Sequence, residues 1–337
     1  MTRLYTRVAG TGHHVPEHVV TNEDLAARIN TSDVWIRERT GIRERRFSQD
    51  GESTAQLALR ASLRALEDAG CAASDLDLIV FATLSPDYFF PGSGVLLGAL
   101  LDIPGVPALD VRNQCSGFLY GLQCADAMIR SGVYRRILLV GAEVHSTGLD
   151  ISDQGRDIAV LFGDGAGAFI LEAAEQEEGA PRGVLGVRLG ADGRHAEALW
   201  CQAPSSAQFP ARITAENLAR REHFPQMKGR LVFKHAVTTM RDAMLGLLEE
   251  LEISLNQVDL LIPHQANLRI SALVQKALAL PDDRVFNNIE RYGNTTAASL
   301  PIAVDESLRL GRLKEGDLLA LVAFGSGFTW GASLIRM

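Results

Sequence analysis

The chain has 337 residues, of which 47% are hydrophobic and 22% are charged, and its formal net charge is −8 at pH 7. This acidic balance argues against nucleic acid as the main partner, because phosphate binding needs a basic face. No segment reaches the roughly 20 apolar residues of a membrane span, and the first residues lack the apolar stretch of a signal peptide. We therefore expect a soluble, cytoplasmic protein that does not bind membranes.

The four cysteines are Cys71, Cys115, Cys124 and Cys201. They form no CxxC pair and stand at no zinc-binding spacing from histidines, which argues against both a disulfide framework and a metal site. We expect reduced thiols and no metal.

The same order of elements occurs twice along the chain. Residues 66–84 read as a helix end, a turn and a buried strand, and residues 248–265 repeat that order, with Asp77 and Asp259 separated by 182 positions. Residues 131–143 and 313–325 both read as a turn followed by an apolar strand, again 182 positions apart. We predict two duplicated βαβ-type halves, residues 1–175 and 176–337. The alternative is that any α/β protein yields such matches.

Each half also carries a predicted helix start. Residues 113–117 follow an expected strand, and residues 292–296 precede an expected helix over 297–310. The offset of 182 carries Cys115 to position 297, three residues beyond Asn294, so a pseudo-twofold fold should bring the two helix starts together. His264 follows a third expected strand, and functional residues of open α/β sheets lie at strand ends. We therefore expect Cys115, His264 and Asn294 to meet.

Cys115 is predicted to be a nucleophile with a lowered thiol pKa, because free N–H groups and the helix dipole favour a thiolate at a helix start. The alternative is a small buried residue that fills the turn. The Ser-Gly that follows and the two partner residues favour the nucleophile.

Cysteine, histidine and asparagine in this order are compatible with two enzyme classes. A papain-like hydrolase uses these three residue types, but its signature Cys-Gly-[Ser/Ala]-Cys-[Trp/Tyr] is absent. A Claisen condensing enzyme uses a cysteine to hold an acyl group while two neutral donors stabilise an enolate. The duplicated layout favours condensation.

Other polar motifs receive no catalytic role. Residues 163–167 (GDGAG) lack the Lys-Ser/Thr of a phosphate-binding loop and are interpreted as a structural turn. The remaining histidines stand in no comparable setting and stay unassigned: His13, His14, His18, His145, His195, His223 and His235.

From end to end the chain resembles the β-ketoacyl-acyl carrier protein synthase III (KAS III) family. The matching segments are GTG at 10–12, NTSDVWIRERTGIRER at 30–45, FGDGAGA at 162–168, HQANLRI at 264–270, GNTTAA at 293–298 and FGSGFTWG at 324–331. The resemblance implies an α/β thiolase-like fold, with the duplicated halves packed as a layered α/β/α/β/α core. Elongating ketosynthases carry a second histidine where Asn294 stands, and degradative thiolases carry a second catalytic cysteine near the C terminus. This chain has neither.

The resemblance also implies a reaction. Cys115 takes an acyl group from acyl-coenzyme A or an acyl carrier, and a decarboxylative Claisen condensation joins it to a malonyl-type or 3-oxoacyl thioester of a carrier protein, as in fatty-acid initiation. His264 and Asn294 donate hydrogen bonds to the extender thioester, and the backbone N–H groups of Cys115 and Ser326 form an oxyanion hole. No resident cofactor is expected.

Further residues match binding positions of the family. Trp35, Arg39 and Arg156 match contacts to the nucleotide end of coenzyme A, and Asn267 matches the pantetheine tunnel. Phe90 matches a pocket residue contributed by the second subunit of a homodimer. Lys234 and Arg269, with Arg220 and Arg221 nearby, match basic positions where an acidic acyl carrier protein docks.

The chain departs from the family in two segments. Arg112-Asn113-Gln114 stand before the cysteine where the family has small apolar residues, and Ser326 stands where it has glycine. Such polar changes also occur in KAS III-like ketosynthases or acyltransferases of secondary metabolism, of the polyketide or alkyl-quinolone type, which handle longer or aromatic acyl chains. A non-catalytic dimeric scaffold is the alternative from another class.

Overall fold

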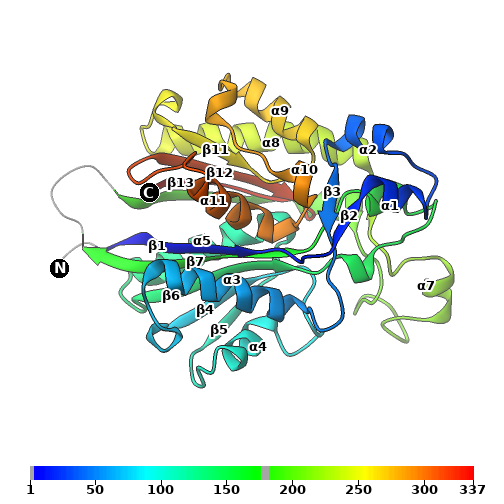
Figure 1. Cartoon of the computed structure of the whole chain (residues 1–337), viewed down its shortest axis with the longest axis horizontal. Helices are drawn as coiled ribbons and strands as arrows, with labels where there is room; N and C mark the ends of the chain where they lie inside the picture. Colours follow the sequence, from blue (N-terminus) through cyan, green and yellow to red (C-terminus); the bar gives the residue numbers. More distant parts are fainter. Residues whose placement is uncertain (1–3, 176–181) are drawn as a thin grey trace.

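The computed structural model describes residues 4–175 and 182–337, and residue 176, where the second half was predicted to begin, lies outside the described residues (Figure 1). Two sheets form the centre of the described structure. The first has the strand order β1 (Leu4–His14), β7 (Gly165–Glu175), β6 (Arg136–Glu143), β4 (Leu78–Ala82) and β5 (Ala108–Val111). The second has the order β8 (Gly183–Ala191), β13 (Thr329–Arg336), β12 (Leu318–Gly325) and β11 (Leu260–Pro263).

The two sheets share one topology and one register. In the first, β4 pairs in parallel with β6 and sets Leu78 opposite Ile137. In the second, β11 pairs in parallel with β12 and sets Leu260 opposite Leu319, so each residue of this pair lies 182 positions after its counterpart in the first sheet. The antiparallel pairs β6–β7 and β12–β13 continue the correspondence. The predicted duplication is confirmed by this pairing.

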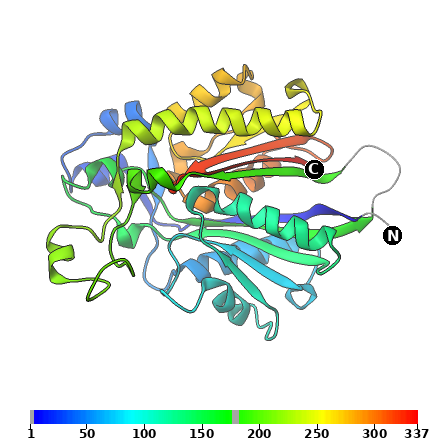
Figure 2. The same ribbon diagram turned by 180° about the vertical axis from the view of Figure 1, so that it is seen from behind.

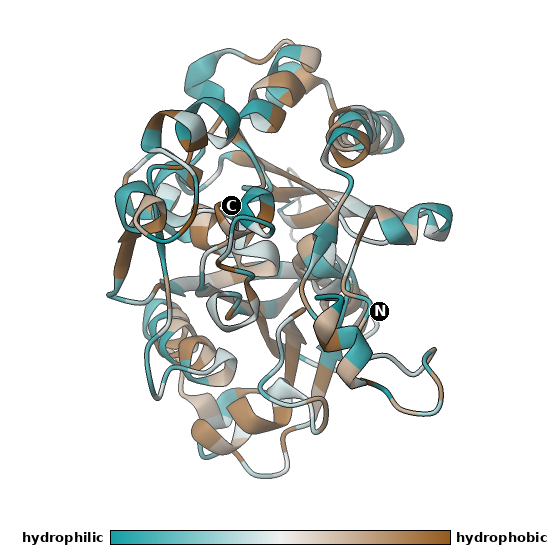
Figure 3. Cartoon of the chain, turned by 90° about the vertical axis from the view of Figure 1, so that its right-hand side faces the viewer, coloured by the Kyte–Doolittle hydropathy of each residue, from teal (hydrophilic) through white to brown (hydrophobic). Residues whose placement is uncertain are grey.

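Five layers stack through the molecule, and the predicted fold class is confirmed. The helices α3 (Thr54–Ala69) and α4 (Ser93–Leu100) cover the outer face of the first sheet, and α8 (Gly229–Glu250) with α9 (Leu268–Ala277) covers that of the second (Figures 1 and 2). Between the sheets lie α5 (Gly117–Arg130) and α11 (Ser299–Arg309), which contact strands of both sheets. Figure 3 shows hydrophobic strands at the centre and hydrophilic segments on the outer helices.

The sequence of each layer explains its place. Strands β4 and β12 are fully buried and read as unbroken apolar runs, as strands covered on both faces must. Helix α5 buries an apolar stripe at helical spacing against the sheets, whose members are Phe118, Leu119, Leu122, Ala125 and Ile129. The central helices therefore hold their N-terminal ends in a fixed position between two sheets.

Shorter elements cap the end of the molecule on the right in Figure 1, opposite the N terminus. They are β2 (Val19–Thr21), α1 (Asn22–Ala26), α2 (Asp33–Thr40), β3 (Glu44–Arg46), α6 (Arg156–Ala159), β9 (Leu199–Trp200), α7 (Ala215–Ala219), β10 (Gln226–Met227) and α10 (Ile289–Tyr292). Short 3-10 turns complete the described chain: η1 (Ala73–Asp75), η2 (Gln114–Ser116), η3 (Ser146–Gly148), η4 (Gly193–Ala198), η5 (Leu255–Gln257), η6 (Asp282–Arg284) and η7 (Thr296–Ala298). In this described part, no helix combines the length and the apolarity that a membrane crossing demands.

Candidate active site

The two central helices begin side by side, in related geometry. The turn η2 leads into α5, and 182 positions later η7 leads into α11. Gln114 and Thr296, the equivalent first residues of these turns, have φ of 43° and 49°, a left-handed conformation that is costly for side chains other than glycine. A Cβ on Gly117 would lie 3.7 Å from the Cβ of Ala297. The predicted meeting of the two helix starts is confirmed.

Cys115 is buried in the first of these turns, with 7% of its surface exposed. Gly325, the last residue of β12, packs against it so closely that an added Cβ would lie 2.7 Å from the Cys115 Cβ and 3.0 Å from Sγ. The backbone N–H groups of Cys115 and Ser326 both lower the pKa of the thiol, because they favour the thiolate. Ser326 does not have a positive φ, so the serine in place of glycine causes no backbone strain there.

The pKa of the Cys115 thiol differs from the sequence-based prediction. Burial raises this pKa to about 12, and the negative charge of Glu143 acts in the same direction. The two backbone N–H groups lower the pKa by less. The predicted lowering was therefore wrong, because desolvation of the anion outweighs the favourable N–H groups. At neutral pH Cys115 is therefore protonated.

His264 follows β11 and is held at both ends. Its backbone N–H donates to the Val322 carbonyl at 2.8 Å, and its ring Nδ1 lies 2.7 Å from the Ser299 hydroxyl. The other ring nitrogen, Nε2, is buried and has no hydrogen-bond partner among the described residues. Burial lowers the pKa of His264 to about 3. His264 is therefore a neutral imidazole with one nitrogen available to a ligand.

Asn294 is buried just before η7 and its backbone pairs with the segment that leads into β7. Its N–H donates to the Leu161 carbonyl at 2.8 Å, and its carbonyl accepts from the Gly163 N–H at 3.1 Å. The side-chain Oδ1 accepts from the Thr296 N–H at 2.9 Å. With Oδ1 engaged, Nδ2 is the part of the amide that can donate to a ligand.

A cavity of about 1130 Å³ opens over Cys115. Its wall comes from the loops that follow β3, β4, β6 and β9, and it includes Thr296 and Ser326. Loops at the carboxyl ends of parallel strands are where ligands bind in open α/β sheets. His264 and Asn294 do not line this cavity in the described structure, although Asn294 bonds to the lining residue Thr296.

Sequence reasoning missed His145, which lines the same cavity. Its Nε2 lies 2.6 Å from the Thr296 hydroxyl, and its backbone N–H donates to Asp164. His145 follows the end of β6 just as His264 follows β11, so the strand-end argument could have found it. Asp164 is buried and also accepts from the N–H of Ser48, so it supports the neighbouring loops. The predicted turn over residues 163–167 was wrong in part, because residues 165–167 belong to strand β7.

The predicted nucleotide-binding residues gather at one point on the surface. The guanidinium groups of Arg39 and Arg156 lie 4.5 Å and 4.6 Å from the centre of the Trp35 ring. Asn267 caps the start of α9 and donates from Nδ2 to the Arg39 carbonyl at 2.9 Å. Phe90 lies apart from this group, in the loop between β4 and α4, and 78% of its surface is exposed.

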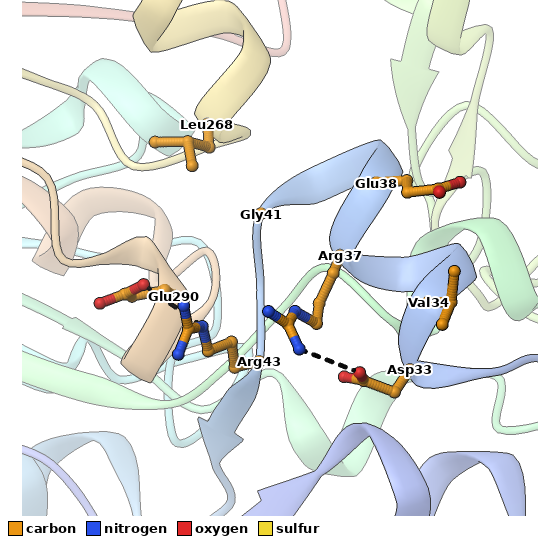
Figure 4. Close-up of a pocket in the computed structure, with 8 residues that line it drawn as sticks. All are labelled: Asp33, Val34, Arg37, Glu38, Gly41, Arg43, Leu268 and Glu290. Carbon is orange, nitrogen blue, oxygen red and sulfur yellow. Dashed lines mark hydrogen bonds and ion pairs between the residues drawn. The ribbon is translucent and has the colours of Figure 1, made fainter.

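A second cavity, of about 430 Å³, lies among α2, α9 and α10 (Figure 4). Arg37 bonds to Asp33 at 3.2 Å, and Arg43 lies 3.5 Å from Glu290. Leu268 forms the upper side in this view. Because these two cations are already paired with carboxylates, the cavity does not offer free positive charge to an acidic partner.

The predicted docking residues fall into two groups. Lys234 on α8 and Arg269 on α9 are exposed, and the Arg269 guanidinium lies 5.6 Å from the Phe233 ring. Arg220 pairs with Glu216 at 2.5 Å, and Arg221 pairs with Asp150. Both arginines follow α7, which Figure 1 places at the lower right, away from α9 at the top. The expectation that they reinforce the basic positions was wrong, since carboxylates neutralise them.

Comparison with known proteins supplies relatives for this arrangement. Residues 109–193 match the family model described as 3-oxoacyl-[acyl-carrier-protein (ACP)] synthase III, and residues 248–337 match its C-terminal counterpart. The beta-ketoacyl-[acyl-carrier-protein] synthase III of Rhizorhabdus wittichii is 45% identical over 98% of both chains.

Two solved structures are similar over nearly the whole chain. The 3-oxoacyl-[acyl-carrier-protein] synthase III of Aquifex aeolicus has a TM-score of 0.88 and 40% identity, over 98% of this chain and 100% of that one. The priming β-ketosynthase of a polyketide biosynthetic pathway has a TM-score of 0.90 and 29% identity, over 100% and 97%.

Proposed function

The chain belongs to the 3-oxoacyl-[acyl-carrier-protein] synthase III family of condensing acyltransferases, and on that premise we propose that it joins an acyl group held on Cys115 to the malonyl-type thioester of an acyl carrier protein. The observation that carries this proposal is the buried Cys115 thiol on the wall of a cavity, beside the Ser326 backbone, where two backbone N–H groups favour negative charge. The test is to incubate the purified protein with an acyl-coenzyme A and a malonyl carrier protein. The 3-oxoacyl carrier protein and carbon dioxide are the expected products.

In the first half-reaction, the Cys115 sulfur attacks the carbonyl carbon of the acyl-coenzyme A thioester. The carbonyl oxygen becomes an oxyanion, and the N–H groups of Cys115 and Ser326, which favour negative charge at this point, are the donors that stabilise it. The carbon–sulfur bond to coenzyme A then breaks, and the thiol proton ends on the released coenzyme A. No resident cofactor takes part in this step.

In the second half-reaction, the extender loses carbon dioxide and negative charge develops on its thioester oxygen. The free Nε2 of His264 and the Nδ2 of Asn294 are the donors that stabilise this charge. The resulting carbanion attacks the acyl carbonyl carbon, the carbon–sulfur bond to Cys115 breaks, and the departing thiolate takes up a proton from water to restore the thiol. His264 must keep its single proton on Nε2 for this role. The Gln265 N–H donates to Ser299 Oγ at 3.5 Å, so the Ser299 hydroxyl hydrogen can point at His264 Nδ1. A ring nitrogen that accepts this hydrogen bond carries no proton, so the proton of the imidazole stays on Nε2.

Ser299→Ala is expected to slow carbon dioxide release about tenfold, the value of one hydrogen bond of about 1.4 kcal/mol, while acyl loading persists. The physical reason is that the imidazole loses the partner that places its proton on Nε2. Radiolabelled carbon dioxide release and adduct mass are measured on one preparation, and nitrogen NMR reports the protonated ring nitrogen. Equal losses in both half-reactions would show that Ser299 only supports the fold.

The surface site at Trp35 suits the nucleotide end of coenzyme A. Two guanidinium groups against one indole ring provide cations for phosphates and a flat face for a base. We assign Asn267 to the pantetheine path because it bonds to the Arg39 backbone beside this site. The exposed ring of Phe90 is assigned to a homodimer interface, from which it reaches the acyl cavity of the second subunit.

Lys234 and Arg269 are assigned to carrier-protein docking. Lys234→Glu is expected to raise KM for the malonyl carrier protein and to weaken the salt dependence of that KM, because an attraction at the surface becomes a repulsion. Loading from acyl-coenzyme A should hardly change. Lys314→Glu, an exposed site in the turn before β12, is the control with the same change of charge. Equal losses with both substrates in Lys234→Glu would indicate a folding defect.

A second candidate is priming of a secondary-metabolite pathway instead of fatty-acid initiation. It is favoured by the polar residues Arg112 and Gln114 on the cavity wall and by the structural likeness to a polyketide-priming ketosynthase. A panel of acyl-coenzyme A thioesters, read out as adduct mass on the protein, discriminates the two. Preference for short unsubstituted acyl groups supports fatty-acid initiation.

A further inference from the structure

Two nitrogen-bearing side chains on the wall of the Cys115 cavity have no partner for their nitrogens. Arg112 comes directly after β5 and forms no ion pair or side-chain hydrogen bond with any described residue. His223 lies on the same wall, and its Nδ1 is buried without a hydrogen-bond partner among the residues described. The His223 Nδ1 is buried, and a buried nitrogen without a partner costs free energy. Arg112 is exposed on the same cavity wall and has no carboxylate partner among the described residues, so both side chains suit a polar, anionic ligand.

Arg112 and His223 line one cavity, and Cys201, which also lines it, lies near both of them. Burial raises the pKa of the Cys201 thiol, while the nearby charge of Arg112 lowers it. The Cys201 sulfur in turn lies 3.4 Å from the His223 carbonyl. Cys115, the nucleophile of the proposed function, lines the same cavity, so an acyl group attached to it enters the space that Arg112 and His223 border.

Carboxylates on the cavity wall do not satisfy Arg112. Asp87 accepts from the Ser93 hydroxyl at 2.7 Å, and Glu52 accepts from the Gln49 N–H at 2.9 Å. Asp50 belongs to an exposed turn and forms no ion pair with Arg112. The guanidinium therefore remains available to an anion that enters the cavity.

We propose that the acyl group carried by Cys115 ends in a carboxylate, bound by the Arg112 guanidinium with the His223 Nδ1–H as a second donor. The substrate class is thus a thioester of a dicarboxylic acid. This proposal rests on the proposed function, in which Cys115 accepts the acyl group. An unsubstituted alkyl group would leave both polar side chains against a methyl end, and a site built to bind a polar group rejects the analogue that lacks it.

The test compares acyl groups matched in carbon number: succinyl with butyryl, glutaryl with pentanoyl, and adipyl with hexanoyl, each as its coenzyme A thioester. In every case the acyl group moves from the sulfur of coenzyme A to that of Cys115, free coenzyme A is released, and the protein gains the acyl mass. The expected result is faster loading of the carboxylated member in at least one pair. The chain length of the pair with the largest difference also indicates how far Arg112 lies from Cys115.

Arg112→Gln should slow loading of the carboxylated member about 10- to 100-fold, the worth of a hydrogen-bonded charge pair, and leave its neutral partner nearly unchanged. The neutral substrate thus verifies that the variant is folded. Arg188→Gln on β8 removes the same charge outside the cavity and should change neither rate.

Three results would overturn the proposal. Faster loading of the neutral member in every pair would show that the cavity binds an acyl group with an apolar end. Equal slowing of both members by Arg112→Gln would show that Arg112 contacts the coenzyme A part of the substrate or supports the fold. Absence of loading from every thioester would instead overturn the proposed function itself, and this proposal with it.

Discussion

Cys115→Ala protein is expected to gain no acyl mass from any acyl-coenzyme A, because alanine offers no nucleophile at the cavity wall where Cys115 stands. Cys201→Ala is the sharpest control, since Cys201 lines the same cavity. Cys124→Ala, on α5 behind the nucleophile, is a second control. Both control variants should still load. The measurement is intact mass after incubation with the thioester and removal of free ligand.

A full adduct on Cys115→Ala protein would contradict the assignment of the nucleophile. Loss of the adduct in Cys201→Ala as well would show that the cavity wall, and not one thiol, is required. The high pKa of Cys115 adds a further expectation, because a neutral thiol must give up its proton during attack. Loading should therefore speed up as the pH rises through the neutral range.

Asn294→Ala is expected to load normally and to lose carbon dioxide release by a factor of about 10²–10³, the usual cost of removing one donor to a developing oxyanion. The two half-reactions separate because charge on the extender oxygen develops only in the second. Radiolabelled carbon dioxide release and adduct mass are measured on the same folded preparation.

The alternative role for Asn294 is local support of the turn, since Oδ1 accepts from the Thr296 N–H. Loss of that contact alone would cost about 1 kcal/mol of stability and affect both half-reactions alike. Thermal unfolding of Asn294→Ala protein measures this part separately. Normal decarboxylation in the variant would remove Asn294 from the active site.

The sequence by itself determined the architecture. Strands buried on both faces must be continuous apolar runs, so the repeated runs at a separation of 182 revealed the duplicated halves, and the pairing registers of the two sheets show the same separation. The same separation relates Gln114 to Thr296 and the first residue of α5 to that of α11. The family resemblance likewise identified Trp35, Arg39 and Arg156, which prove to lie together.

Only the tertiary structure decided the electrostatics of the site. The pKa of Cys115 depends on its burial and on Glu143, and neither the depth of a residue nor its distant neighbours can be read from a local motif. The pairing of Arg221 with Asp150 removed a predicted basic residue for the same reason. His145 and His223 reach the cavity through loops from separate parts of the chain. Charges act through space, so their partners become known only when the fold brings distant segments together.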